Sequence, residues 1–267
     1  MSKTSIWVWT VVIIIIIVGV IYWIWAANNS MNSSTTLNSG QAQNTVQLAS
    51  TSSLGSFLTD SKGRTLYYFA NDAANQSNCT GTCLTIWLPF YAPTISVPTN
   101  LNSTDFNQIT TAAGTNQTTY KGWPLYYYSG DVNSGDTKGQ GIQNLWFVAP
   151  NPFYNVLIMN NSKSNSYLAD VNGLAIYYNK TDTQGTSSAD PKSTCTGNCL
   201  STWSIFDQSQ AVAPSLLKSA DFKEFTRPDG QTQLSYKGWP LYQYSGDSTS
   251  GDAKGDGISK TWYLVKP

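Results

Sequence analysis

The sequence predicts a mainly β protein made of two tandem repeats, each built from β-hairpin units, preceded by one transmembrane helix. The first reason is a long internal duplication: residues 120–147 and 236–263 agree at 19 of 28 aligned positions, with a constant offset of 116. The second is that Tyr, Phe, Trp, Thr and Val recur in alternating runs between turn sequences, which favours strands. The third is an uncharged apolar run at residues 6–27, which supplies the predicted helix.

The predicted transmembrane anchor occupies residues 1–27. A helix over the 22 apolar residues would be about 33 Å long, enough to cross a bilayer, and tryptophans lie near both of its ends. Lys3 is the nearest charge, so we expect a cytoplasmic N-terminus, a single pass through the cell membrane and extracytoplasmic repeats. A cleaved signal peptide ending near Ala27 is the alternative, but the apolar run is longer than the usual core of such a peptide.

The rest of the chain divides into a linker and two repeats. Residues 28–45 carry no charge and few apolar side chains, which predicts a flexible linker. Repeat 1 is predicted at 46–150 and repeat 2 at 153–267, because the duplicated segments extend over these ranges. A fainter duplication inside each repeat, visible when 63–72 is aligned with 122–131, predicts four related hairpin units.

Composition excludes several classes of function. The chain has 15 basic and 15 acidic residues and no basic stripe, which argues against nucleic-acid binding. It has no histidine, which excludes Ser-His-Asp and Cys-His catalysis and removes the commonest ligand of haem and copper. A hydrolase that uses carboxylates alone, such as Asp131 and Asp136, stays open without positive support. We therefore predict that the protein is not an enzyme.

The cysteines form two CTGxC pairs, and we predict a disulfide within each: Cys79 with Cys83, and Cys195 with Cys199. Disulfides are the default outside the cytoplasm, and a spacing of four on a helical turn brings the Cα atoms to about 6 Å, within bonding reach. One alternative is a redox-active dithiol, although the spacing differs from Cys-x-x-Cys. Another is a zinc site formed by all four cysteines.

Two loops rich in aspartate, 131–136 and 247–252, are candidates for a calcium site. Carboxylate, amide and hydroxyl oxygens at short spacing are the ligands of a hard cation, but the EF-hand pattern is not met. The alternative, which we favour, is that the first aspartate of each loop caps a turn by accepting backbone N–H bonds. The candidate metal ligands are Asp131, Asp136, Asp247 and Asp252.

A tyrosine–aspartate motif, Y-x-[FWY]-x-x-D, occurs at 67–72, 126–131 and 242–247, and in an altered form at 177–182. In the altered copy, Asn179 stands where an aromatic residue is expected. Together with the C-x-G-x-C pairs and the G-W-P-L-Y runs, these motifs resemble the family described as a secreted repeat of unknown function. Its members are also described as predicted lipoproteins with a Yx(FWY)xxD motif. The resemblance extends over both tandem copies.

The resemblance implies extracytoplasmic repeats tethered to a membrane and implies no activity. The chain departs from the family in its protein anchor, which replaces a lipidated cysteine, and in the third motif, where Asn179 puts the role of that copy in doubt. The motif aromatics either pack in the core, as alternation along strands favours, or stack against carbohydrate. The candidate binding residues are Tyr67, Phe69, Asp72, Tyr126, Tyr128, Asp131, Tyr177, Asp182, Tyr242, Tyr244 and Asp247.

The sequence as a whole predicts a membrane-anchored extracytoplasmic protein that binds or scaffolds at the cell surface. Its expected partners are the membrane, through the anchor, and a cell-surface protein or glycan, because tethered repeats suit avidity rather than turnover. One alternative is an accessory protein that binds calcium, which would be its one cofactor. The other is a thiol-disulfide redox protein that uses the CTGxC pairs.

Overall fold

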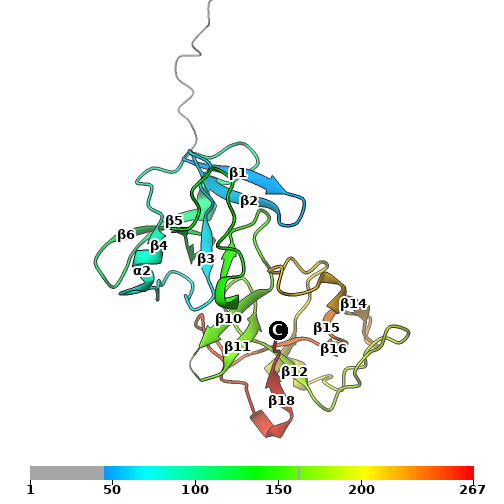
Figure 1. Cartoon of the computed structure of the whole chain (residues 1–267). Helices are drawn as coiled ribbons and strands as arrows, with labels where there is room; N and C mark the ends of the chain where they lie inside the picture. Colours follow the sequence, from blue (N-terminus) through cyan, green and yellow to red (C-terminus); the bar gives the residue numbers. More distant parts are fainter. Residues whose placement is uncertain (1–44, 162) are drawn as a thin grey trace, which may run out of the picture. The chain divides into compact units, whose positions relative to one another are not determined.

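The computed structural model describes residues 45–161 and 163–267 (Figure 1). Residues 43–267 form one compact unit. The predicted anchor at 1–27 lies outside the described residues, as does the predicted linker except for its last residue. Within the part of the chain that the structure describes, no helix is both long and apolar enough to span a membrane.

The first repeat combines a hairpin, a four-stranded sheet and a three-stranded sheet. The hairpin pairs β1 (Val46–Thr51) with β2 (Gly55–Asp60). The four-stranded antiparallel sheet has the order β4-β8-β3-β9, and the three-stranded sheet has the order β5-β6-β7. The strand bounds are β3 Tyr67–Phe69, β4 Trp87–Pro89, β5 Phe106–Thr110, β6 Asn116–Tyr120, β7 Trp123–Pro124, β8 Tyr126–Tyr128 and β9 Trp146–Val148.

The second repeat has the same strand arrangement. Its hairpin pairs β10 (Leu157–Asn161) with β11 (Asn165–Ala169), and its sheets have the orders β13-β17-β12-β18 and β14-β15-β16. The strand bounds are β12 Ile176–Asn179, β13 Trp203–Ile205, β14 Phe222–Thr226, β15 Thr232–Tyr236, β16 Trp239–Pro240, β17 Tyr242–Tyr244 and β18 Trp262–Leu264. The prediction of a mainly β protein is confirmed.

The helices of the described residues are single turns. An α-helical turn begins at the second cysteine of each pair, and 3-10 turns precede β5, β9, β14 and β18. The bounds are α2 Cys83–Ile86, α3 Cys199–Thr202, η1 Ser103–Asp105, η2 Ile142–Asn144, η3 Ser219–Asp221 and η4 Ile258–Lys260.

Strand β3, at the centre of the first four-stranded sheet, buries both of its faces. In β3, Tyr67 and Tyr68 point to opposite sides of the sheet, as successive strand residues do, and neither is exposed. Tyr67 packs in a small cluster confined to the first repeat. Tyr68 packs in a larger core that continues into the second repeat, so the two repeats share one hydrophobic interior.

Candidate functional site

The tyrosines of the motif face each other in the centre of each four-stranded sheet. In the first repeat, the register of β3 and β8 places Tyr67 opposite Tyr126. Each tyrosine then donates a hydrogen bond to the aspartate of the other motif: Tyr67 to Asp131 at 2.7 Å, and Tyr126 to Asp72 at 2.8 Å. The two motifs of one repeat therefore complete each other, and neither forms a site alone.

The second repeat contains the same exchange. Tyr177 lies opposite Tyr242 across β12 and β17. The Tyr177 hydroxyl donates to Asp247 at 2.6 Å, and the Tyr242 hydroxyl donates to Asp182 at 2.7 Å. The altered third motif has thus kept its tyrosine and its aspartate in the same role, although Asn179 replaces its middle aromatic.

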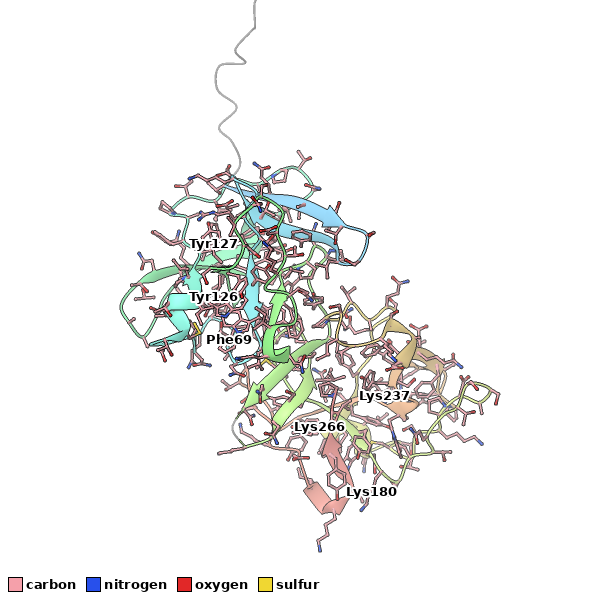
Figure 2. All side chains as sticks on the ribbon, in the orientation of Figure 1. Phe69, Tyr126, Tyr127, Lys180, Lys237 and Lys266 are labelled. Carbon is pink, nitrogen blue, oxygen red and sulfur yellow. A yellow bond between two sulfur atoms is a disulfide. The ribbon has the colours of Figure 1, made fainter. Side chains whose placement is uncertain are left out.

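The middle aromatics of the motif form the two ends of a stack of rings. In the first repeat the order is Phe69, Trp146, Trp87 and Tyr128, with ring centroids 4.1, 3.7 and 4.6 Å apart. Phe69 and Tyr126 lie among the side chains that fill this repeat (Figure 2). The interpretation that most of these aromatics pack in the core is confirmed.

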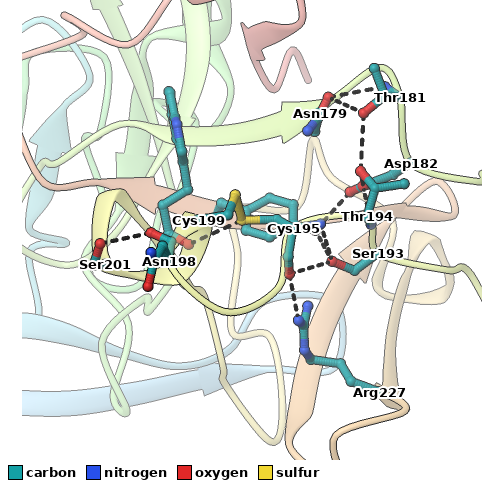
Figure 3. Close-up of a disulfide and its surroundings, with 12 residues drawn as sticks. Asn179, Thr181, Asp182, Ser193, Thr194, Cys195, Asn198, Cys199, Ser201 and Arg227 are labelled. Atoms are coloured by element: carbon teal, nitrogen blue, oxygen red, sulfur yellow. Dashed lines mark hydrogen bonds between the residues drawn. A yellow bond between two sulfur atoms is a disulfide. The ribbon is translucent and has the colours of Figure 1, made fainter.

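In the second repeat the stack is one ring shorter. Trp262 and Trp203 lie 3.8 Å apart, and Tyr244 follows at 4.6 Å. Asn179 is opposite Trp262, in the position of the missing ring, and its amide oxygen accepts the Thr181 N–H at 3.0 Å (Figure 3). The asparagine therefore stabilises a local turn where the first repeat has a stacked phenylalanine.

Gly139, which ends the segment Gly-Asp-Thr-Lys-Gly at 135–139, is required by this cluster. The Gly139 N–H donates to the Tyr67 hydroxyl at 3.2 Å, and a Cβ atom at Gly139 would lie 2.8 Å from both Trp87 and Tyr67. Gly255 has the corresponding contacts with Trp203 and Tyr177. The spaced motifs of the sequence are thus parts of one packed cluster in each repeat.

Burial sets the electrostatics of the exchanged pairs. The four motif tyrosines have no exposed surface, and Asp72 is 1% exposed. Burial raises the pKa of Asp72 to about 8, against the lowering effect of the hydrogen bonds from Asn78 and Tyr126. Burial also raises the pKa of Asp131 and of Tyr67. Of the candidate binding residues, Tyr128, Asp131 and Tyr244 are partly exposed and the others are buried, so most of the motif residues stabilise the interior.

Both predicted disulfides are present, Cys79–Cys83 and Cys195–Cys199. Cys79 is 3% and Cys195 is 1% exposed, and the Arg227 guanidinium donates to the Cys195 carbonyl at 2.7 Å (Figure 3). The zinc alternative is wrong, because all four sulfur atoms are bonded in pairs. The disulfides hold the turns that precede the edge strands β4 and β13.

The aspartate-rich loops are turns closed by their own carboxylates. The Asp136 carboxylate accepts hydrogen bonds from the backbone N–H groups of Val132 and Asn133, both at 3.0 Å. It also forms an ion pair with Lys138 at 2.7 Å. The lysine hydrogen bond holds the pKa of Asp136 at about 2. Asp131 accepts the Lys138 N–H at 2.9 Å besides the tyrosine hydroxyl.

The second loop repeats this pattern. Asp252 accepts from Ser248, Thr249 and Lys254, and Asp247 accepts the Lys254 N–H at 3.0 Å. Among residues 45–161 and 163–267, no three His, Cys, Asp or Glu side chains are grouped as metal ligands. The geometry fits the capped turns that we favour, and calcium binding stays an untested alternative.

An exposed aliphatic surface next to β4 was missed by the sequence analysis. We call Ile86, Leu88 and Val132 the β4 surface; they are 48%, 47% and 80% exposed. Their segments are neighbours, because the Ser129 N–H donates to the Ile86 carbonyl at 2.9 Å. A pocket of 160 Å³ adjoins Leu88 and is also lined by Arg64.

The second repeat has polar residues at all of these positions. Thr202, Ser204 and Ser248 replace the members of the β4 surface, and all three are exposed. The adjoining depression of 610 Å³ is lined by polar residues such as Asp207 and Thr232 and by the apolar residues Leu200 and Ile205. Aligning the two repeats position by position would have found this surface from the sequence. The alignment shows apolar residues in the first repeat where the second repeat has polar ones.

The fold and the disulfides define a disulfide-bonded tandem-repeat protein. Three segments, 49–90, 108–150 and 223–266, match the family model described as a secreted repeat of unknown function. The match fits an extracytoplasmic repeat protein. The expectation of two copies is corrected: the family unit is shorter than the predicted repeat and matches three times, and the altered motif at 177–182 lies outside the matched segments. No curated protein and no solved structure matches the chain.

Proposed function

We propose that this protein is a membrane-anchored binding or scaffolding module at the cell surface, and that it binds a partner protein through the β4 surface. The observation that carries the proposal is the exposure of Ile86, Leu88 and Val132 on the first repeat, at positions where the second repeat is polar. A repeated fold needs no such difference for its stability, so the difference points to a contact that only the first repeat makes.

The chemistry of the β4 surface suits a protein partner. Aliphatic side chains gain about 25 cal/mol for each Å² that a partner removes from water. β4 is an edge strand of its sheet, so a partner can approach it from the open side. Arg64, whose side chain is 49% exposed, supplies a polar rim beside Leu88.

A glycan partner fits the surface less well. Stacking against sugar rings needs exposed aromatic faces, but Trp87 is 4% and Trp146 is 2% exposed. Tyr91 is 41% exposed near β4, and Tyr127 and Tyr128, which line the pocket beside Leu88, are partly exposed, so the glycan alternative is tested in the binding assay. The apolar run at 6–27 supports anchoring on its length, and the absence of histidine supports a role without catalysis.

The test compares binding of the fragment 43–267, a compact unit, with that of a variant carrying the residues of the second repeat, Ile86→Thr, Leu88→Ser and Val132→Ser. Binding to envelopes from the source cells is measured by co-sedimentation. Leu216→Ser is the matched control, because Leu216 is 44% exposed elsewhere in the fold. We expect saturable binding that the triple variant loses and the control retains.

The nature of the partner is tested in the same assay. Treating the envelopes with protease should abolish binding if the partner is a protein, whereas removal of glycans should not. Binding that the triple variant retains would overturn the role of the β4 surface. Binding that survives protease and is lost on glycan removal would replace the protein partner with a glycan.

The thiol-disulfide alternative makes a different prediction. A redox protein exposes a readily reduced disulfide, whereas one cysteine of each pair is buried here: Cys79 and Cys195 are 3% and 1% exposed, and Cys83 and Cys199 are partly exposed. We expect that the native fragment shows no reactive thiols after mild reduction and four after unfolding in reductant. Rapid reduction of the folded protein would favour the redox function.

A further inference from the structure

One face of the first repeat is closed by the second repeat. We call Tyr68, Trp123 and Phe147 the sealed face, and none of these side chains has exposed surface. The Tyr68 ring packs edge-to-face against Phe153 at 5.9 Å and against Tyr154 at 5.8 Å. These two residues lie immediately before β10, the first strand of the second repeat.

Two hydrogen bonds fix the geometry of this contact. The Trp123 indole N–H donates to the carbonyl of Val171 at 2.9 Å, in the turn that follows β11. The Asn160 N–H, on the edge of β10, donates to the carbonyl of Ala70 at 2.9 Å. One face of a repeat thus contacts a different surface, the hairpin, of the next repeat. Such a heterologous contact can be continued from copy to copy.

In the second repeat the corresponding face is only partly covered by residues 45–161 and 163–267. We call Tyr178, Trp239 and Tyr263 the C-terminal face; they align with the sealed face, and each is partly exposed. Tyr178 and Trp239 remain packed together, with ring centroids 5.1 Å apart. Within residues 45–161 and 163–267, the Trp239 indole N–H has no hydrogen-bond acceptor, whereas its counterpart Trp123 has one.

Lysines border the C-terminal face. Lys180 stands where the first repeat has Ala70, and its ammonium group lies 5.6 Å from the centre of the Tyr263 ring. Lys180 and Lys237 extend from the second repeat (Figure 2). An indole and a tyrosine ring with lysine rims are typical of a protein contact that is partly exposed to water.

The first repeat carries the complementary hairpin. The turn at 60–63 is built as the turn at 170–173: Gly63 donates to the Asp60 carbonyl at 3.0 Å, and Gly173 to the Asp170 carbonyl at 2.9 Å. Asp60 Oδ1 also accepts the Arg64 N–H, as Asp170 Oδ1 accepts the Leu174 N–H.

Strands β1 and β10 make equivalent backbone contacts within their own repeats. The Val46 N–H donates to the carbonyl of Ser96 at 3.2 Å, and the Val156 N–H donates to that of Val212 at 3.2 Å. Ser50 then occupies the position of Asn160, the residue whose N–H bonds to the preceding repeat, and Ser50 is exposed. The first repeat therefore presents the same edge that β10 uses.

We propose that the C-terminal face binds the β1 edge and the 60–63 turn of a second copy of this chain, so that copies join head-to-tail as the two repeats join within one chain. The Ser50 N–H donates to the Lys180 carbonyl, as the Asn160 N–H donates to the Ala70 carbonyl within one chain, and the Trp239 indole packs against the turn. Because the C-terminal face and the β1 edge lie on different repeats, a copy that uses one of them still presents the other, so the assembly is open and grows by addition of copies.

The contact between chains is weaker than the contact within a chain. Leu157 and Met159 of the buried hairpin correspond to Gln47 and Ala49 in the first repeat, so less apolar area is removed from water. The covalent link between the repeats also raises their effective concentration, an advantage that two separate chains lack. Assembly is therefore expected at high concentration, as on a crowded surface.

The experiment is sedimentation velocity of the purified fragment 43–267 from micromolar to millimolar concentration. We expect the mean mass to rise with concentration in the wild type. Trp239→Ala removes the centre of the face and Ser50→Pro removes the edge donor, so each should weaken association about tenfold or more. Ser50→Ala keeps the N–H and should assemble as wild type, and so should Tyr91→Ala, an exposed aromatic elsewhere.

Mixing the two variants distinguishes a head-to-tail contact from a symmetric one. Trp239→Ala keeps its hairpin and Ser50→Pro keeps its face, so the mixture should form dimers and nothing longer. Dimers in the mixture also show that both variants are folded; Tyr263→Ala is a second face variant if Trp239→Ala fails to fold. A wild type that stays monomeric, or a mixture without dimers, would overturn the proposal. The β4-surface triple variant should assemble normally, because this inference goes beyond the proposed function and uses another surface.

Discussion

The first and the second repeat share their buried polar exchange but differ around it. Both join each tyrosine of one motif to the aspartate of the other, and both enclose the pair with stacked tryptophans. They differ in one ring of the stack, in a buried arginine and in the exposed β4 surface. The shared exchange and stacking explain the spaced motifs as residues that pack in the interior. The surface that binds a partner is therefore expected among the features that differ between the repeats.

Among the substitutions, the largest expected loss of stability comes from replacing the buried arginine that only the second repeat has. The Arg227 side chain is fully buried and donates to Gln233 Oε1 at 2.6 Å and to the Cys195 carbonyl at 2.7 Å. Arg227→Met leaves both oxygens without this donor and should lower the free energy of unfolding by about 4 kcal/mol, measured in urea.

The first repeat supplies the matched control for that variant. Thr111 occupies the position of Arg227, and Gln117 Oε1 is buried there without a partner among the described residues. Thr111→Ala should therefore change stability by about 0.5 kcal/mol or less. A small effect of Arg227→Met would show that the second repeat tolerates an unpaired glutamine oxygen as the first does.

The repeats also differ in the ring at one end of the stack. Placing the residue of each repeat at the corresponding position of the other tests this difference. Phe69→Asn removes the ring that stacks on Trp146 at 4.1 Å and should cost about 3 kcal/mol. Asn179→Phe should add a ring over Trp262 and stabilise by about 1 kcal/mol, because the gain in stacking is reduced by the loss of the Thr181 turn. Urea unfolding measures the change in the free energy of unfolding for each of the two variants. Destabilisation by Asn179→Phe would mean that the turn, and not the ring, holds this position.

The pH dependence of stability tests the exchange in the first repeat. Burial raises the pKa of Asp72 from 3.8 to about 8, so the folded state keeps a proton that the unfolded state releases near pH 4. This stability is complete below pH 4 and is lost as the pH rises to 8, by about 1.4 kcal/mol per pH unit.

Thermal melting between pH 5 and 8 measures how stability falls as the pH rises. The Asp72→Asn variant should lose less stability over this range. The control is Asp136→Asn: the pKa of Asp136 is held at about 2, so its contribution is lost only as the pH falls below 4 and the slope above pH 5 should not change. An Asp72→Asn variant with the wild-type slope would show that Asp72 is ionised in the folded protein.

The sequence predicted what depends on local pattern and on repetition. The strand-rich fold, the disulfides and the packing of most aromatics follow from residue types, from the Cys79–Cys83 spacing and from alternation. The tyrosine–aspartate exchange did not follow, because Tyr67 bonds to an aspartate 64 residues away, through the register of β3 and β8. The β4 surface did not follow either, because the exposure of Leu88 depends on β4 being an edge strand.

The smallest expected effect concerns calcium, and it applies to both repeats alike. Asp131 and Asp247 each accept a tyrosine hydroxyl and a lysine backbone N–H, while Asp136 and Asp252 each accept two backbone N–H groups and a lysine. A calcium ion would have to displace these donors, and the bound lysines would repel it.

Calorimetric titration of calcium into the fragment 43–267 should therefore show no saturable heat, and chelation should leave the melting temperature unchanged. The double variant Asp131→Asn/Asp247→Asn provides the comparison. Saturable heat in the wild type that this variant loses would make the loops ion sites. It would also mean that Lys138 and Lys254 move away on binding, because their ion pairs with Asp136 and Asp252 occupy the carboxylates that the cation needs.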